Sequence, residues 1–74
     1  MMKLYKGELY ALTNKKENWF AFDVRYTHKR NGKLYFESTV YYWRYIVDCE
    51  TMEVSRQDLD TKEIINLNIT VKII

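Results

Sequence analysis

The chain of 74 residues has no proline, only two glycines, one cysteine and one histidine. A single cysteine excludes an internal disulfide framework, and a single histidine leaves too few ligands for a closed zinc site. Gly7 and Gly32 lie too far apart in the chain to form a glycine-rich phosphate loop. No run of about eighteen apolar residues is present, so we expect no membrane span and no membrane partner.

A large excess of charge of one sign is also lacking. Lys and Arg number 12 against 10 Asp and Glu, so the net charge is only +2. A dedicated duplex-binding domain usually carries a more one-sided basic surface. The opening segment MMKLYKGELY has no apolar run of the secretory type, and the lone thiol suits a reducing compartment. We therefore expect a soluble, cytoplasmic protein.

Apolar and aromatic residues are abundant, at 47% and 16% of the chain. The length predicts one domain, residues 1–74. A chain of this size buries only about 60% of its unfolded surface, so its stability is marginal. Without disulfides or a metal, it needs a dense core or association with another chain.

Two patterns predict the secondary structure. Between residues 65 and 73 every odd position is apolar and every even one polar, which indicates a half-buried strand. Asn31-Gly32 is the strongest short signal for a hairpin, and β-rich sequence lies on both sides of it.

The predicted fold is all-β. Five sequential antiparallel strands form a meander that curls into a small barrel, SH3-like or similar, or a half-barrel. The first four predicted strands are Lys3–Thr13, Trp19–Lys29, Lys33–Val47 and Met52–Arg56, and the fifth is the alternating segment.

Two registers compete in the central hairpin. A two-residue turn would pair Arg30 with Lys33 and bury Glu37, whereas a three-residue loop pairs Lys29 with Lys33 and places Arg25 opposite Glu37. An unpaired buried carboxylate costs several kcal/mol, more than the roughly 0.2–1 kcal/mol of one cross-strand pair. We therefore predict the three-residue loop, which also sets Trp19 opposite Trp43. The predicted inner face is Phe20, Phe22, Val24, Tyr26, Leu34, Phe36, Val40, Tyr42 and Ile46.

The segment YYWRY, residues 41–45, follows from this register. Tyr42 points into the core, while Tyr41, Trp43 and Tyr45 point outward beside Trp19. The outer face is then an aromatic surface with interspersed charge. The alternative is that another segment of the chain covers these rings.

Catalysis is not expected. His28 lies near the predicted hairpin tip and Cys49 near its far end, and strands of about ten residues span roughly 33 Å. Asp58 and Asp60 fall in a predicted turn, where Asp is favoured because it bonds its own backbone. We therefore predict a protein that is not an enzyme, with no cofactor, no metal and no small-molecule substrate.

The function class favoured by these residues is a small binding module for a protein partner or for a second copy of the chain. Trp, Tyr and Arg dominate the residues that anchor protein interfaces. The predicted partner-binding residues are Trp19, Arg25, Tyr41, Trp43 and Tyr45.

A second hypothesis is a single-stranded nucleic-acid binder. Outward aromatics flanked by cations form a stacking platform for bases. In this reading the same rings act together with Lys29, Arg30, Lys33 and Tyr35. The abundance of Lys, Asn, Ile and Tyr is typical of an AT-rich genome, which suggests as a hypothesis a phage or mobile-element protein that modulates a host protein.

Overall fold

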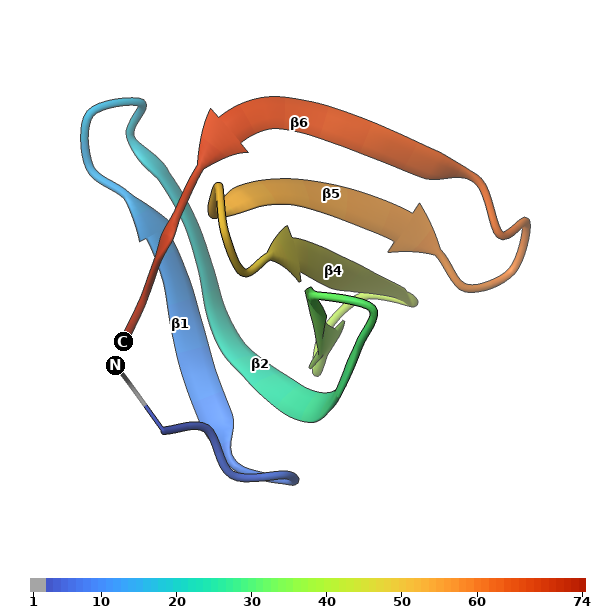
Figure 1. Cartoon of the computed structure of the whole chain (residues 1–74). Helices are drawn as coiled ribbons and strands as arrows, with labels where there is room; N and C mark the ends of the chain where they lie inside the picture. Colours follow the sequence, from blue (N-terminus) through green and yellow to red (C-terminus); the bar gives the residue numbers. More distant parts are fainter. Residues whose placement is uncertain (1–2) are drawn as a thin grey trace.

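Residues 3–74 are described by the computed structural model, and their regular elements are all β-strands (Figure 1). Met1 and Met2 of the predicted domain lie outside the described residues. No helix in the described part of the chain is long and apolar enough to cross a membrane. The strands are β1 (Leu9–Asn14), β2 (Trp19–Arg30), β3 (Lys33–Ser38), β4 (Trp43–Asp48), β5 (Glu53–Asp58), β6 (Ile64–Thr70) and β7 (Lys72–Ile73).

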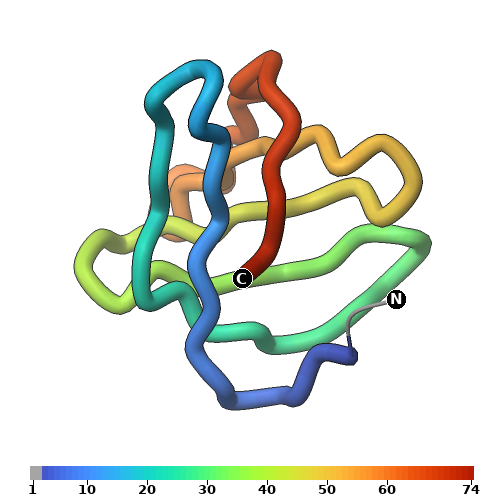
Figure 2. Tube along the Cα trace, turned by 90° about the vertical axis from the view of Figure 1, so that its left-hand side faces the viewer, coloured from blue at the N-terminus to red at the C-terminus, as the bar shows by residue number. Residues whose placement is uncertain are grey.

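The strands form one antiparallel sheet in the order β6-β5-β4-β3-β2-β1-β7. The all-β prediction is confirmed, but the sheet has seven strands rather than five. It curls strongly without closing into a barrel, because β6 pairs only with β5 and β7 only with β1. The chain passes from one sheet edge to the other through Val71, whose N–H bonds the carbonyl of Met52 at 2.9 Å (Figure 2).

The hairpin turn is shorter than predicted. Arg30 pairs with Lys33, so Asn31 and Gly32 alone form the turn. Their φ angles are 51° and 73°, which is the two-residue turn that suits the twist of a hairpin. The prediction of a three-residue loop is wrong.

A bulge at Thr27 accounts for the difference. The register shifts by one residue between Tyr26 and His28, so that Arg25 lies opposite Glu37 as predicted. Glu37 is exposed, and Tyr26 and Phe36 are buried. The extra residue in β2 thus supplies the shift that we had assigned to the turn.

A second irregularity in β2 reverses which side chains face the core. Asp23 has a φ of 53°, and the pairing with β1 shifts from Tyr10↔Val24 to Leu12↔Ala21. Ala21 is therefore buried, while Phe20 and Phe22 are exposed. Their predicted core positions are wrong because the alternation of the strand does not continue through Asp23.

The predicted strand Lys33–Val47 is broken by a turn at residues 39–42. The Ser38 hydroxyl accepts hydrogen bonds from the N–H groups of Val40 and Tyr41, at 3.1 and 2.9 Å, which ends β3. The turn reverses the predicted alternation of buried and exposed side chains. Tyr45 and Val47 of β4 are buried, and Val40 and Tyr42 of the turn are exposed.

The core lies on the concave side of the curled sheet. Its fully buried side chains come from β1 to β5. The sheet has to curl so that side chains from five strands meet in one core. Val24, Tyr26, Leu34 and Phe36 are buried as predicted, whereas Ile46 is only half-buried. The largest fully buried side chains are Phe36, Leu12, Val24, Val47 and Val54.

Candidate functional site

Five large apolar side chains are exposed on β2 and on the turn after β3, two segments that are joined by a hydrogen bond from Thr39 to the Asp23 carbonyl. They are 41% to 76% exposed. We call them the aromatic patch: Phe20, Phe22, Val40, Tyr41 and Tyr42. Exposed apolar clusters on small domains generally mark interaction surfaces.

Phe20 and Phe22 form the strand part of the patch. Their rings stack with centroids 5.6 Å apart and planes 5° from parallel. They share a face because they are two residues apart in a strand. The left-handed residue Asp23 ends this phase directly after Phe22, so the pair stays on the outside.

The loop part of the patch is tied to the strand part. The Thr39 hydroxyl donates to the Asp23 carbonyl at 2.8 Å, and the Leu59 N–H donates to the Tyr42 carbonyl at 3.1 Å. Figure 2 shows this loop, in yellow-green, beside the bend of β2. The patch is therefore held by hydrogen bonds at both ends of the loop.

The other aromatics of the predicted surface lie next to Tyr41. Tyr41 stacks on Trp43 at 4.3 Å, and the Arg56 guanidinium lies 4.4 Å from the Trp43 ring. Trp43 donates from Nε1 to the Tyr45 hydroxyl at 2.9 Å, and Trp19 packs edge-on against Tyr45 at 5.7 Å.

The structure thus brings Trp19, Tyr41, Trp43 and Tyr45 together, but only Tyr41 is exposed. Trp19 and Trp43 are half-buried against the core and Tyr45 is buried, so the predicted outward orientation of these three rings is wrong. Trp19 pairs across the sheet with Asn14 rather than with Trp43.

Arg25 is separate from this cluster. Its side chain is exposed and donates from Nη1 to the Gly7 carbonyl at 2.8 Å. It therefore has a structural contact in the turn that precedes β1.

The residues of the nucleic-acid hypothesis lie at the hairpin tip, on β2 and β3. Lys29 and Arg30 are exposed, but Lys33 forms an ion pair of 2.8 Å with Asp48. This hydrogen bond raises the pKa of Lys33 and lowers that of Asp48. One of the three predicted phosphate contacts is therefore already paired within the chain.

Tyr35 is not free to stack on a base in the predicted way. Its ring stacks on His28 with centroids 4.4 Å apart, and the Arg44 guanidinium lies 4.8 Å from it. Along β2, Phe22 and Arg30 are eight residues apart, roughly 26 Å at the rise of a strand. Base-stacking rings and free cations are thus on different parts of the molecule.

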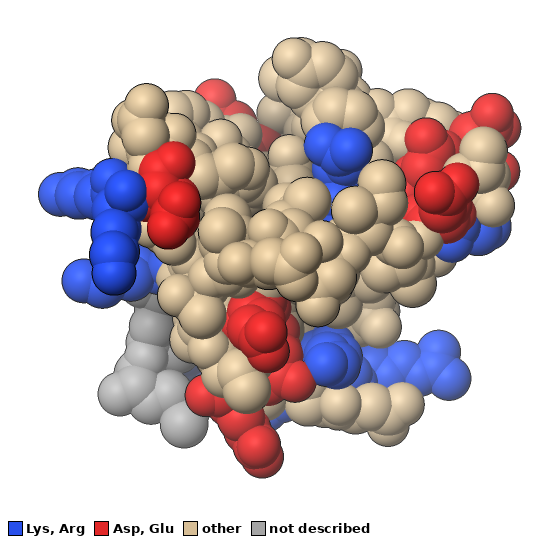
Figure 3. Space-filling view, turned by 90° about the horizontal axis from the view of Figure 1, so that it is seen from above, with Lys and Arg blue, Asp and Glu red and all other residues tan. Residues whose placement is uncertain are grey.

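The face shown in Figure 3 carries separate basic and acidic groups across a mainly uncharged surface. This distribution agrees with the net charge of +2.

His28 and Cys49 lie at the same end of the sheet, contrary to the prediction. Lys33 pairs with Asp48, and the Cys49 N–H bonds the Gly32 carbonyl at 2.9 Å, so Cys49 returns to the hairpin tip. His28 is on the outer face with Tyr35 and accepts or donates a hydrogen bond with Thr27 Oγ1 at 2.9 Å. Within residues 3–74 no group of His, Cys, Asp and Glu side chains is arranged to hold a metal ion.

Phe20, Phe22, Val40 and Tyr42 were assigned to the core from the sequence. The residue that could have indicated the exposure of Phe20 and Phe22 is Asp23, because Asp is disfavoured inside strands and tolerates a positive φ. For Val40 and Tyr42 the corresponding signal is Ser38-Thr39, since both residues favour turns.

Comparisons with protein-family models, curated proteins and solved structures give no match for this chain, so its function has to be inferred from its own geometry.

Proposed function

We propose that the chain is a non-enzymatic binding module that recognises a protein through the aromatic patch. The observation that supports this most strongly is the exposure of five apolar side chains on a loop and strand that are hydrogen-bonded to each other. A rigid surface loses little conformational freedom on binding, so more of the contact energy remains as affinity.

Two further features favour a protein over a nucleic acid. Tyr and Phe are enriched in the centres of protein interfaces, where charge is depleted, and the patch itself contains no charged residue. The free cations Lys29 and Arg30 are at the other end of β2. A second copy of the chain is one candidate for the partner, because a domain of this size gains apolar burial by association.

The test compares a patch variant, Phe22→Ser with Tyr42→Ser, with the control Tyr5→Ser. Tyr5 is 56% exposed but lies in the turn before β1, so the control removes a similar ring from another surface. Sedimentation equilibrium measures self-association, and affinity capture after nuclease treatment measures other partners. We expect the wild type and Tyr5→Ser to bind alike, and the patch variant to lose binding at least about tenfold.

A titration with a mixed single-stranded oligonucleotide addresses the competing hypothesis. Binding that falls steeply between low and high salt and depends on Lys29 and Arg30 would replace the protein proposal with the nucleic-acid one. Equal partner binding by the patch variant and the wild type would also overturn the proposal.

A further inference from the structure

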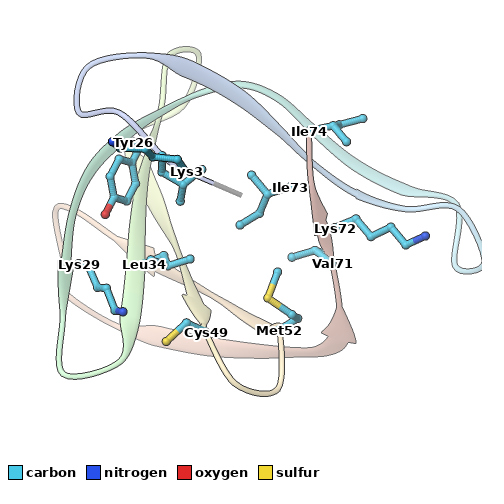
Figure 4. Close-up of a pocket in the computed structure, with 11 residues that line it drawn as sticks. Lys3, Tyr26, Lys29, Leu34, Cys49, Met52, Val71, Lys72, Ile73 and Ile74 are labelled. Carbon is cyan, nitrogen blue, oxygen red and sulfur yellow. The ribbon is translucent and has the colours of Figure 1, made fainter. Parts of the chain in front are cut away.

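An apolar hollow of about 690 Å³ opens on the concave side of the sheet, where β7, the β2–β3 hairpin and the turn after β4 meet (Figure 4). Its walls include the buried side chains Leu34 and Val71 and the half-buried Met52 and Ile73. This volume is within the range of about 300–1,000 Å³ found for small-molecule sites. The hollow is therefore large enough for a ligand with an apolar body.

The charged residues that line the hollow are all basic. They are Lys3, Lys29 and Lys72, with no acidic residue among the described residues that line it. In Figure 4 the Lys29 side chain lies on the same wall as the Tyr26 hydroxyl, whereas the Lys72 side chain extends away from the hollow. Lys29 thus gives the apolar space a basic edge, and the charge of that edge favours an anion.

The bulge at Thr27 is the reason that a lysine faces the hollow. Regular alternation from the buried Tyr26 would turn His28 inward and Lys29 outward. The register shift reverses this: His28 stacks on Tyr35 on the outer face, and Lys29 pairs with Leu34, whose side chain lines the hollow. Bulges commonly re-aim a side chain at the rim of a curled sheet.

Lys29 is exposed, and its ammonium has no ion pair within residues 3–74. Its charge is therefore available to a ligand. An anion bound there would be held by a charge-assisted hydrogen bond, the stronger class of hydrogen bond in proteins.

We propose that this hollow binds an alkyl carboxylate, with the carboxylate at the Lys29 ammonium. The alkyl chain lies along Leu34, Met52 and Val71, where its burial supplies most of the binding free energy. The site is separate from the aromatic patch and goes beyond the proposed function. From the sequence we expected no small-molecule substrate. The pattern of the sequence does not reveal this hollow, because residues near both ends of the chain contribute to it.

The experiment is calorimetric titration of the full chain with dodecanoate below its micelle concentration. We expect saturable binding of one molecule, with amide chemical-shift changes concentrated at Leu34, Met52 and Val71. Dodecyltrimethylammonium, which has the same tail and the opposite charge, should bind at least about tenfold more weakly.

Lys29→Met tests the head group. Because it removes a charge-assisted hydrogen bond, the affinity for dodecanoate should fall about tenfold, while the affinity for the uncharged dodecanol stays the same. The matched control is Arg30→Met, which makes the same change in net charge at a residue that does not line the hollow. It should bind dodecanoate as the wild type does.

Four results would overturn the proposal. The first is no saturable binding of dodecanoate, and the second is equal affinity for the cationic amphiphile. The third is an equal loss of affinity in Arg30→Met, which would indicate attraction by overall charge. Shift changes at Phe20, Phe22 and Tyr42 instead of at the hollow would likewise reject this site without affecting the proposed function.

Discussion

The indole Nε1 of Trp43 donates a 2.9 Å hydrogen bond to the hydroxyl of Tyr45, two residues further along β4. Residues at this spacing in a strand share a face, and Tyr45 is 7% exposed, so both rings belong to the concave side. The bond gives the buried hydroxyl a partner, which it would otherwise lack at a cost of about 1–3 kcal/mol. The two rings therefore contribute to stability as well as supporting Tyr41.

Trp43→Ala should destabilise the fold. Replacement of a fully buried Trp by Ala costs about 3–5 kcal/mol, and because Trp43 is half-buried we expect about 2–3 kcal/mol. Tyr45→Phe keeps the packing and removes the hydroxyl, so we expect about 1 kcal/mol. The free energy of unfolding in urea measures both.

Tyr42→Ala is the control for Trp43→Ala. Tyr42 is 69% exposed and adjacent in sequence, so its loss should change the free energy of unfolding by no more than about 0.5 kcal/mol. If Trp43→Ala costs no more than Tyr42→Ala, Trp43 is a surface residue and its contact with Tyr45 contributes nothing.

Asp23 determines which face of β2 presents Phe20 and Phe22. Because its φ is 53°, a β-branched side chain is strained there, and Asp23→Val should destabilise the protein by about 1–2 kcal/mol. Asp23→Asn should change the stability by less than about 0.5 kcal/mol, since Asn also tolerates this conformation. Both variants keep the carbonyl that accepts from Thr39. Equal unfolding free energies for the two variants would show that the left-handed residue is not required.

The fold class follows from features that the sequence displays locally. The alternation of residues 65–73 predicts a strand, and β6 and β7 occupy it. Asn31-Gly32 predicts the hairpin, and Asp58 forms the predicted turn by accepting hydrogen bonds from the amides two and three residues later. Asp48 forms a turn with the same two bonds. Each of these signals acts within a few residues.

The candidate site depends on strand phase, which local patterns do not determine. One extra residue at Thr27 and one left-handed residue at Asp23 each exchange the two faces of β2. The turn at residues 39–42 does the same for YYWRY. The hollow could not be predicted from the sequence either, because residues near both ends of the chain meet only after the sheet has curled.

Tryptophan fluorescence reports whether the two indoles pack against other side chains, as the strand register places them. Trp19 and Trp43, the only tryptophans, both pack against Tyr45 or Tyr41. We expect native emission at shorter wavelength than in urea and partial protection from acrylamide. Tyr5→Ser is a suitable control, because it removes an exposed ring that stacks on neither indole. Emission that does not shift on unfolding would contradict the packing described.

The ion pair between Lys33 and Asp48 makes stability depend on pH. The Lys33 ammonium holds the pKa of the Asp48 carboxyl below its ordinary value of 3.8, and the N–H groups of Thr51 and Glu50 lower it further. The folded state therefore keeps this carboxylate ionised where the unfolded chain takes up a proton. Its contribution is complete above the ordinary pKa and is lost as the pH falls from there toward the folded pKa.

Asp48→Asn should therefore lower the free energy of unfolding at pH 7 and do so much less at about pH 2.5, where the wild-type carboxyl has lost part of its advantage. Asn keeps the oxygen that accepts from Glu50 and Thr51, so the turn itself is preserved. Asp58→Asn is the matched control: Asp58 accepts the same two turn bonds, and its pKa is also lowered, but no lysine bonds it. Urea unfolding at both pH values should show the larger pH-dependent difference for Asp48→Asn. Equal differences for the two variants would mean that the turn amides, rather than Lys33, stabilise the Asp48 carboxylate.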